Sequence, residues 1–83
     1  MTFVADIVVM PLDQLLDPQG KAVEMGLQHL GFSAIENVRV GKNIRVKVTA
    51  QSRNEAEKMV REAAEKLLCN PVMEYFTFTL KEI

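Results

Sequence analysis

The segment from Thr2 to Met10 constrains the fold more than any other part of the chain. Almost every residue in it is β-branched or apolar, and apolar side chains occupy both sets of alternating positions around Asp6. Successive side chains of a strand point to opposite faces, so this pattern predicts a strand buried on both faces. The two sets are Phe3, Ala5, Ile7 and Val9 on one face, and Val4, Val8 and Met10 on the other.

A first helix is predicted from Pro18 to Leu30. Asp17 is suited to the N-cap, proline is favoured at the first helical position, and Gly31 can close the helix in a left-handed conformation. Its apolar stripe comprises Ala22, Val23, Gly26, Leu27 and Leu30.

A second helix is predicted after Ser52, which forms a capping-box pattern with Glu55. Asn70-Pro71 should end it, because proline disfavours helical geometry in the residue before it. The apolar stripe of this helix comprises Ala56, Met59, Val60, Ala63 and Leu67.

Three further strands complete the expected pattern. Ala34–Val40 precedes Gly41-Lys42-Asn43, which is typical of a hairpin turn, and the segment from Ile44 to Thr49 then alternates between apolar and polar residues. A last strand is expected over Val72–Leu80. Its apolar face carries Phe76, Phe78 and Leu80, and its other face carries Tyr75, Thr77 and Thr79.

The predicted order is β-α-β-β-α-β, the ferredoxin-like split βαβ pattern of the α+β class. It implies one domain over residues 1–83, with a four-stranded antiparallel sheet and two helices on one face. Two helices can cover only one sheet face, so apolar side chains of the first strand should remain on the other. We therefore expect sheet-mediated self-association, with Val4, Val8 and Met10 as the candidate contacts.

Composition narrows the classes of partner. The formal net charge of −1 argues against a nucleic-acid-binding domain, which normally carries a basic stripe. The N-terminal segment has no basic region and is interrupted by Asp6 and Pro11, so neither a signal peptide nor a membrane helix is expected. A cytoplasmic location is predicted, and the single cysteine, Cys69, is expected to be a buried small apolar residue.

The chain offers few groups for catalysis. His29 and Cys69 lie on different predicted helices, and His29 is expected to be an exposed residue near a helix end. No Cys or His pair has metal-ligand spacing, and the four glycines do not form a phosphate-binding loop. We predict no catalytic residue, no metal site and no bound cofactor in this chain.

The sequence lacks the signatures of several functions that ferredoxin-like domains perform. Pro11-Leu12-Asp13-Gln14 replaces the Cys-x-x-Cys of a copper chaperone, and Ile44–Val48 lacks the stacking aromatic residues of an RNA-recognition motif. An acylphosphatase-type site would require an arginine in the loop after the first strand, but the first arginine of this chain is Arg39. A free-standing ligand-binding regulatory module of the ACT kind stays open as an alternative.

Four blocks of sequence follow one another along the chain: Asp17–Glu24, Leu30-Gly31-Phe32, Val38–Lys42 and Glu65–Glu74. In this order they resemble the PurS family over nearly the whole chain. Cys69, where the family more often has alanine, and the apolar tail from Tyr75 to Leu80 depart from its usual pattern.

The resemblance implies a role without chemistry in purine biosynthesis. The PurS family is the small subunit of formylglycinamidine ribonucleotide (FGAM) synthase, an ATP-dependent, glutamine-hydrolysing amidating ligase. The resemblance implies a dimer or tetramer that bridges a glutaminase subunit and a large synthetase subunit and assists ammonia transfer. ATP, Mg²⁺ and glutamine would be used by those partners.

Three polar residues in the matching blocks are candidates for partner contacts. Local geometry explains the capping residues, the glycines and the proline, but it does not require Gln19, Arg39 or Lys42. We predict that these three contact the larger subunits, with solvated surface charge as the alternative.

Overall fold

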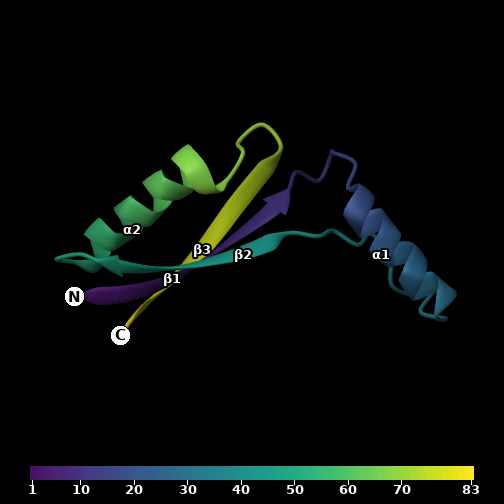
Figure 1. Cartoon of the computed structure of the whole chain (residues 1–83), viewed down its shortest axis with the longest axis horizontal. Helices are drawn as coiled ribbons and strands as arrows, with labels where there is room; N and C mark the ends of the chain where they lie inside the picture. The colour runs from purple at the N-terminus through teal and green to yellow at the C-terminus, as the bar shows by residue number, and fades with distance from the viewer.

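The computed structural model describes residues 1–83 as one antiparallel sheet with two helices and a short π-helical turn. The strands lie in the order β2-β1-β3, so β1 is central (Figure 1). The elements are β1 (Thr2–Pro11), α1 (Pro18–His29), β2 (Lys42–Thr49), α2 (Arg53–Ala63), the turn η1 (Ala64–Leu68) and β3 (Glu74–Glu82).

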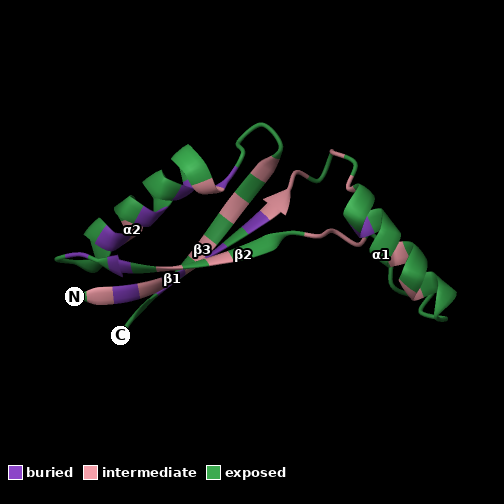
Figure 2. Ribbon diagram, viewed as in Figure 1, coloured by how far each residue is buried: buried purple, intermediate pink, exposed green.

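The pairing of β1 with both neighbours places one row of apolar side chains across the sheet. Ile7 lies opposite Ile44 of β2 and Phe78 of β3. Phe3, Ala5, Ile7 and Val9 are almost completely buried beneath α2, which contributes Ala56 and Val60 to the same core. Along β1 the buried positions alternate with mostly half-buried ones, whereas α2 is buried at Ala56 and Val60, one turn apart (Figure 2).

The opposite sheet face has no helix over it. Val8 is exposed there and Val4 and Met10 are half-buried, so the prediction that β1 is buried on both faces was correct for only one of them. Arg45 of β2 lies beside Asp6, with 2.7 Å between Nε and Oδ1. The apolar residues of this face therefore form a narrow stripe along β1, interrupted by an ion pair.

The four-stranded ferredoxin-like sheet was wrong, because the segment from Ala34 to Val40 is not a strand. Backbone donors of this segment bond to side chains of the α1 region instead of a neighbouring strand: Val38 N–H donates to Glu24, and Val40 N–H donates to Asp17. Asn37 also has a positive φ of 59°, which interrupts an extended run. The expected hairpin is absent too, since Lys42 and Asn43 already belong to β2, which pairs with β1.

The placement of both helices on one sheet face was also wrong. Only α2 covers the sheet, whereas α1 lies at the far end of the molecule, beyond the tips of β1 and β2 (Figure 1). The structure is accordingly long and thin, with extents of 51 × 27 × 14 Å. Gly20 is the one buried residue of α1 (Figure 2).

The predicted helix ends are confirmed. Asp17 and Ser52 are the N-caps of α1 and α2, and Gly31 has a φ of 96° immediately after the C-cap of α1. The second helix continues into η1, where the Cys69 N–H donates to the Ala64 carbonyl, before the extended backbone at Cys69 ends it. The last strand begins two residues later than expected, because Val72 and Met73 lie in the turn that follows Pro71.

Candidate functional site

The Asp17 carboxylate ties the start of α1 to the segment that leads into β2. One oxygen, Oδ1, accepts from the Gly20 N–H at 2.9 Å, as an N-cap does. The other, Oδ2, accepts from the Val40 N–H at 2.8 Å. A single side chain therefore both begins the helix and fixes the helix against a segment 23 residues further along the chain.

Glu24 and Gly20 extend this junction along α1. Glu24 accepts the Val38 N–H at 3.0 Å, one helical turn after Gly20. A Cβ added at Gly20 would collide with the Val38 carbonyl and with the Asp17 carboxylate, so the close approach of the two backbones requires glycine. We call Asp17, Gly20, Glu24, Val38 and Val40 the α1 junction.

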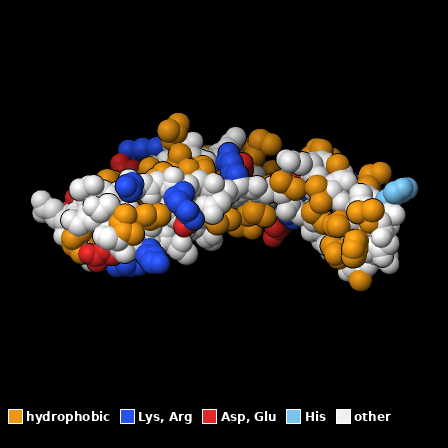
Figure 3. All heavy atoms as spheres, turned by 60° about the horizontal axis from the view of Figure 1, so that its bottom comes forward, with side chains coloured by type: hydrophobic (Ala, Val, Ile, Leu, Met, Phe, Trp, Pro, Cys, Tyr) orange, Lys and Arg blue, Asp and Glu red, His pale blue; other side chains and the backbone are white.

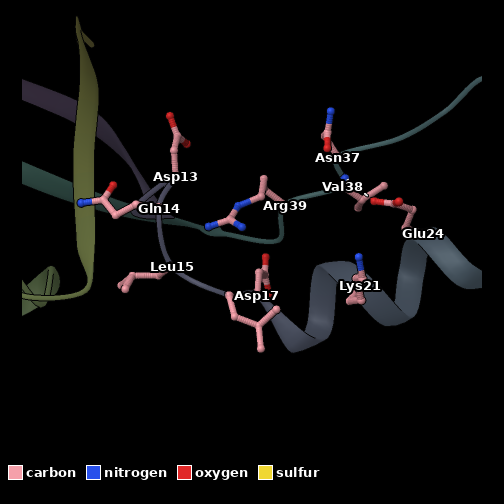
Figure 4. A pocket seen from close by; sticks show the side chains of 10 residues that line it. Asp13, Gln14, Leu15, Asp17, Lys21, Glu24, Asn37, Val38 and Arg39 are labelled. Carbon is pink, nitrogen blue, oxygen red and sulfur yellow. Dashed lines mark hydrogen bonds between the residues drawn. The ribbon is translucent and has the colours of Figure 1, made fainter.

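A recess of about 650 Å³ opens beside the α1 junction (Figure 4). Arg39 points across it toward the loop that follows β1, where its Nη2 donates to the Leu12 carbonyl at 2.6 Å. The Nε of Arg39 is buried without a hydrogen-bond partner in this structure. Asp13, Lys21 and Asn37 also line the recess, which gives it a surface of mixed charge.

A second recess of about 270 Å³ adjoins the first, since Leu16 and Asp17 line both. Gln19 and Lys42 line this second recess together with Glu74 at the start of β3. The three predicted contact residues therefore lie in two adjoining recesses, with Gln19 and Lys42 in one and Arg39 in the next. Their predicted role in binding a partner stays a prediction.

The hydrogen bonds at the α1 junction also affect its electrostatics. The Gly20 N–H, followed by the Val40 N–H, stabilises the ionised carboxylate and holds the pKa of Asp17 below its ordinary value of 3.8. Asp17 is thus a fixed negative charge at neutral pH. Its carboxylate is already occupied by two backbone donors, and Glu24 and Arg39 are hydrogen-bonded as well, which leaves Asp13 and Lys21 as the charged side chains of the recess with most freedom to meet a partner.

The histidine and the cysteine lie apart from both recesses. His29 is exposed at the last residue of α1, as predicted. Cys69 is buried beside the core, also as predicted, and burial raises the pKa of its thiol. No group of His, Cys, Asp and Glu side chains in the structure could hold a metal ion. No helix is long and apolar enough to cross a membrane.

Asp17 and Glu24 were not predicted as site residues. Asp17 was expected only as a helix cap, and nothing in the local pattern signals that its second oxygen bonds to Val40. Glu24 was noted only as the last residue of the first matching block, and nothing local signals its bond to Val38. The structure defines a class of small α+β domain in which one helix lies on the sheet and the other is held away from it. Polar recesses lie beside the α1 junction.

Comparisons with known proteins give the family. The PurS family model, described as phosphoribosylformylglycinamidine (FGAM) synthase, matches residues 4–82. The Archaeoglobus fulgidus protein named phosphoribosylformylglycinamidine synthase subunit PurS is 35% identical over 79 residues, which cover 95% of this chain and 99% of that protein. The chain belongs to the PurS family.

Solved structures agree in fold over the whole chain. Thermus thermophilus PurS is 38% identical, with a TM-score of 0.90 over 100% of this chain and 99% of that chain. A chain in the structure of PurLQS from Thermotoga maritima is 30% identical, with a TM-score of 0.89 over 96% of this chain and 98% of that chain. The three-stranded sheet with α1 held away from it thus resembles solved members of the family.

Proposed function

We propose that this chain is a non-catalytic small subunit of phosphoribosylformylglycinamidine synthase and acts in purine biosynthesis by assembling with other subunits. The observation that carries the proposal is the family match over residues 4–82, together with relatives of nearly equal length that are named as subunits of this enzyme. The likeness to a chain of the Thermotoga maritima PurLQS structure supports assembly into a complex.

In this role the chain bridges a glutaminase subunit and a large ATP-dependent synthetase subunit. ATP, Mg²⁺ and glutamine are used by those partners, and the small subunit helps ammonia to pass from one active site to the other. Ammonia is mostly protonated in neutral water and is diluted by it, so amidation gains when the two sites are held together and shielded from solvent. The proposal places the chain in the cytoplasm, where an unpaired cysteine stays reduced.

The recesses beside α1 are the proposed contact surface for the larger subunits. Gln19 and Lys42 are exposed in one recess, and Arg39 lies in the other. Lys42 is the first residue of β2 and makes no hydrogen bond or ion pair within the chain through its side chain, so its charge is available to a partner. Arg39 is different, because it already bonds to the Leu12 carbonyl.

The chain is also proposed to form a homo-oligomer, either a dimer or a tetramer. Val4, Val8 and Met10 remain the candidate contacts on the open sheet face. Support comes from the exposed position of Val8 and from Tyr75, which lies opposite Met10 and extends the apolar stripe. The Asp6–Arg45 pair would set the register of a second sheet on this face.

Reconstitution of the complex tests the bridging role. The chain is added to its purified glutaminase and synthetase partners, and turnover is followed separately with glutamine and with ammonium salt as the nitrogen source. Glutamine-dependent turnover should rise strongly on addition, while ammonia-dependent turnover by the synthetase should change little. The Lys42→Glu variant serves as a comparison, because its surface charge is reversed without removing a contact within the chain.

Equal glutamine-dependent turnover with and without the chain would refute the bridging role. A free-standing ligand-binding module would instead need no partner, and a small molecule would raise its melting temperature by mass action. Turnover of any substrate by the chain alone would refute the non-catalytic part of the proposal.

A further inference from the structure

The recess of about 650 Å³ beside the α1 junction is large enough for a small molecule. We call it the Arg39 recess. Its volume lies within the roughly 300–1,000 Å³ of sites that bind small ligands. Three segments line it: the loop after β1, the first turns of α1 and the segment that leads into β2 (Figure 4). Because Asp17 and Glu24 bond α1 to the last of these segments, the fold fixes the shape of the recess.

Arg39 lines this recess with most of its donors unused. A guanidinium has five N–H groups, and the one hydrogen bond of this side chain runs from Nη2 to the Leu12 carbonyl at 2.6 Å. The Nε group is buried and has no partner in the chain. A buried donor without an acceptor is unfavourable, and a guanidinium is well suited to a carboxylate. Arg39 is therefore placed to receive an acceptor from outside the chain.

Two other charged side chains of the Arg39 recess have no partner. Asp13 and Lys21 both line it, and neither makes a hydrogen bond or an ion pair through its side chain. Opposite charges do pair elsewhere on the exposed surface of the chain, in three ion pairs. In this recess they are instead held apart, on the loop after β1 and on α1.

The free charges follow one another across the recess as negative, positive, positive. Arg39 lies between Asp13 and Lys21 in the close view (Figure 4). On the face that Figure 3 shows, hydrophobic side chains gather over the α1 end of the molecule, and most charged side chains lie over the sheet. The charges of the Arg39 recess are therefore a local feature and do not continue a charged surface over α1 on that face.

We propose that the Arg39 recess binds a free α-amino acid in its zwitterionic form. The carboxylate of the ligand lies between Arg39 and Lys21, and its ammonium group lies on Asp13. The side-chain amides of Gln14 and Asn37 also line the recess and suit a ligand with a polar, uncharged side chain.

Electrostatics favours a zwitterion over a simple ion. Three carboxylates and two cations line the recess, so its net charge of −1 repels a free anion such as phosphate. A simple cation would lie close to Lys21 and Arg39 and would be repelled by them. A ligand that carries both charges pairs with the free groups of each sign and brings no net charge into the recess.

A ligand bound in this way also connects the segments that form the recess. It joins the loop after β1, α1 and the segment before β2 through one molecule. Occupancy should therefore slow the hydrogen exchange of the Val38 and Val40 N–H groups, which donate to the carboxylates of the α1 junction. Ligand binding adds to the bridging role and does not replace it, since Gln19 and Lys42 line the second recess.

Titration of the ¹⁵N-labelled chain with L-glutamine, followed by amide chemical shifts, tests the site. L-Glutamine is the probe because it is a zwitterion with an uncharged side-chain amide. We expect saturable shifts that are largest around Asp13, Lys21 and Arg39, with a Kd on the order of 1 mM because the contacts are partly exposed. The Val38 and Val40 amides should exchange more slowly in the saturated sample.

Ligands that carry only one of the two charges are the first controls. Acetate supplies the carboxylate and ethylammonium supplies the ammonium group, with the ionic strength held constant. Each should bind at least about 10-fold more weakly than L-glutamine, because it leaves one sign of charge in the recess unpaired.

Neutral variants identify the groups that bind. Lys21→Met and Asp13→Asn each remove one charge without removing a bond within the chain, and each should weaken binding about 5- to 30-fold. Lys58→Met and Glu65→Gln make equivalent changes at exposed residues outside the recess and should bind as the wild type does. Without ligand, all four should keep the thermal transition of the wild type.

Four results would overturn the proposal. These are no saturable shift up to about 10 mM L-glutamine, shifts centred away from the Arg39 recess, equal binding of L-glutamine and acetate, or unchanged affinity in both Lys21→Met and Asp13→Asn. The first three use only the wild-type chain, so they decide the question even where a variant does not fold. Failure of the reconstitution assay would leave all these measurements unchanged, so the two proposals fail separately.

Discussion

The Oδ2 atom of Asp17 accepts the Val40 N–H at 2.8 Å, while Oδ1 of the same carboxylate caps α1 through Gly20. This one side chain explains why α1 lies away from the sheet. The helix is tied at its first turn to a segment that continues directly into β2, so its direction is set by that segment and not by packing on the core.

Removal of the Asp17 carboxylate should loosen α1 without unfolding the sheet. In Asp17→Ala both backbone donors lose their acceptor, and the cap of α1 is lost. We expect lower helical ellipticity and a lower melting temperature for α1, measured by circular dichroism. Asp13→Ala removes a nearby carboxylate that makes no hydrogen bond in the structure, so it should behave as the wild type; an equal loss in both variants would contradict this account.

Acid should weaken the same contact. The pKa of Asp17 is lowered in the folded chain, so its contribution to stability is present above the ordinary value of 3.8 and is lost as the pH falls through the lower folded value. The melting temperature of the wild type should therefore approach that of Asp17→Asn as the pH falls below about 4. Glu62, whose pKa is lowered by Lys66, is present in both proteins and cancels from this comparison. A constant difference across this pH range would count against the carboxylate's role.

Gly20 and Gly26 should respond in opposite ways to alanine. A side chain at Gly20 would collide with the Val38 carbonyl, so Gly20→Ala must separate α1 from its junction and lower the melting temperature. Gly26→Ala meets nothing in the chain and should gain roughly 0.5–1 kcal/mol from helix propensity. Thermal melts at protein concentrations too low for self-association measure the shift in melting temperature of each variant. Equal shifts in the two variants would show that the junction tolerates a wider spacing between α1 and the Val38 segment.

The elements that could be predicted from sequence are those determined by local chemistry. Ser52 with Glu55 fixes the start of α2, Asp17 that of α1, and the alternation around Ile7 identifies the central strand. The absence of a strand at Ala34–Val40 could not be predicted in this way. The backbone donors of this segment are satisfied by Asp17 and by Glu24, and a contact across 14 or 23 residues leaves no local pattern.

The same distinction applies to the candidate site. Gln19, Arg39 and Lys42 were singled out because local geometry did not require them, and the structure places them in two adjoining recesses. Sequence could not show that Arg39 also bonds to the Leu12 carbonyl, which gives it a structural role. Sequence also could not show that the sheet face without a helix is partly polar, since this depends on the register of β1 and β2 that sets Arg45 beside Asp6.

A charge at Val8 should weaken association through the open sheet face. Val8 is 37% exposed in the centre of that face, so Val8→Lys can be accommodated by the folded chain. The oligomer should lose mass in light scattering while the thermal transition of the diluted chain stays within a few degrees of the wild type. Thr77→Lys places the same charge on β3 directly opposite Val8 and should act in the same direction. Unchanged mass in both variants would remove Val4, Val8 and Met10 from the contact surface.

Reversal of charge at Lys42 should separate binding from folding. Lys42 is exposed and its side chain makes no ion pair within the chain, so Lys42→Glu should leave the thermal transition nearly unchanged while it weakens binding to the larger subunits. A loss on the order of 1–2 kcal/mol, or about 5- to 30-fold in Kd, is expected for a contact of this kind. Gln19→Ala tests the same recess without a charge change.

Arg39→Glu should weaken binding and also lower the melting temperature, because it breaks the bond to Leu12. Isothermal titration with the purified subunits measures these differences, and undiminished binding by Lys42→Glu and Gln19→Ala would place the partner surface elsewhere.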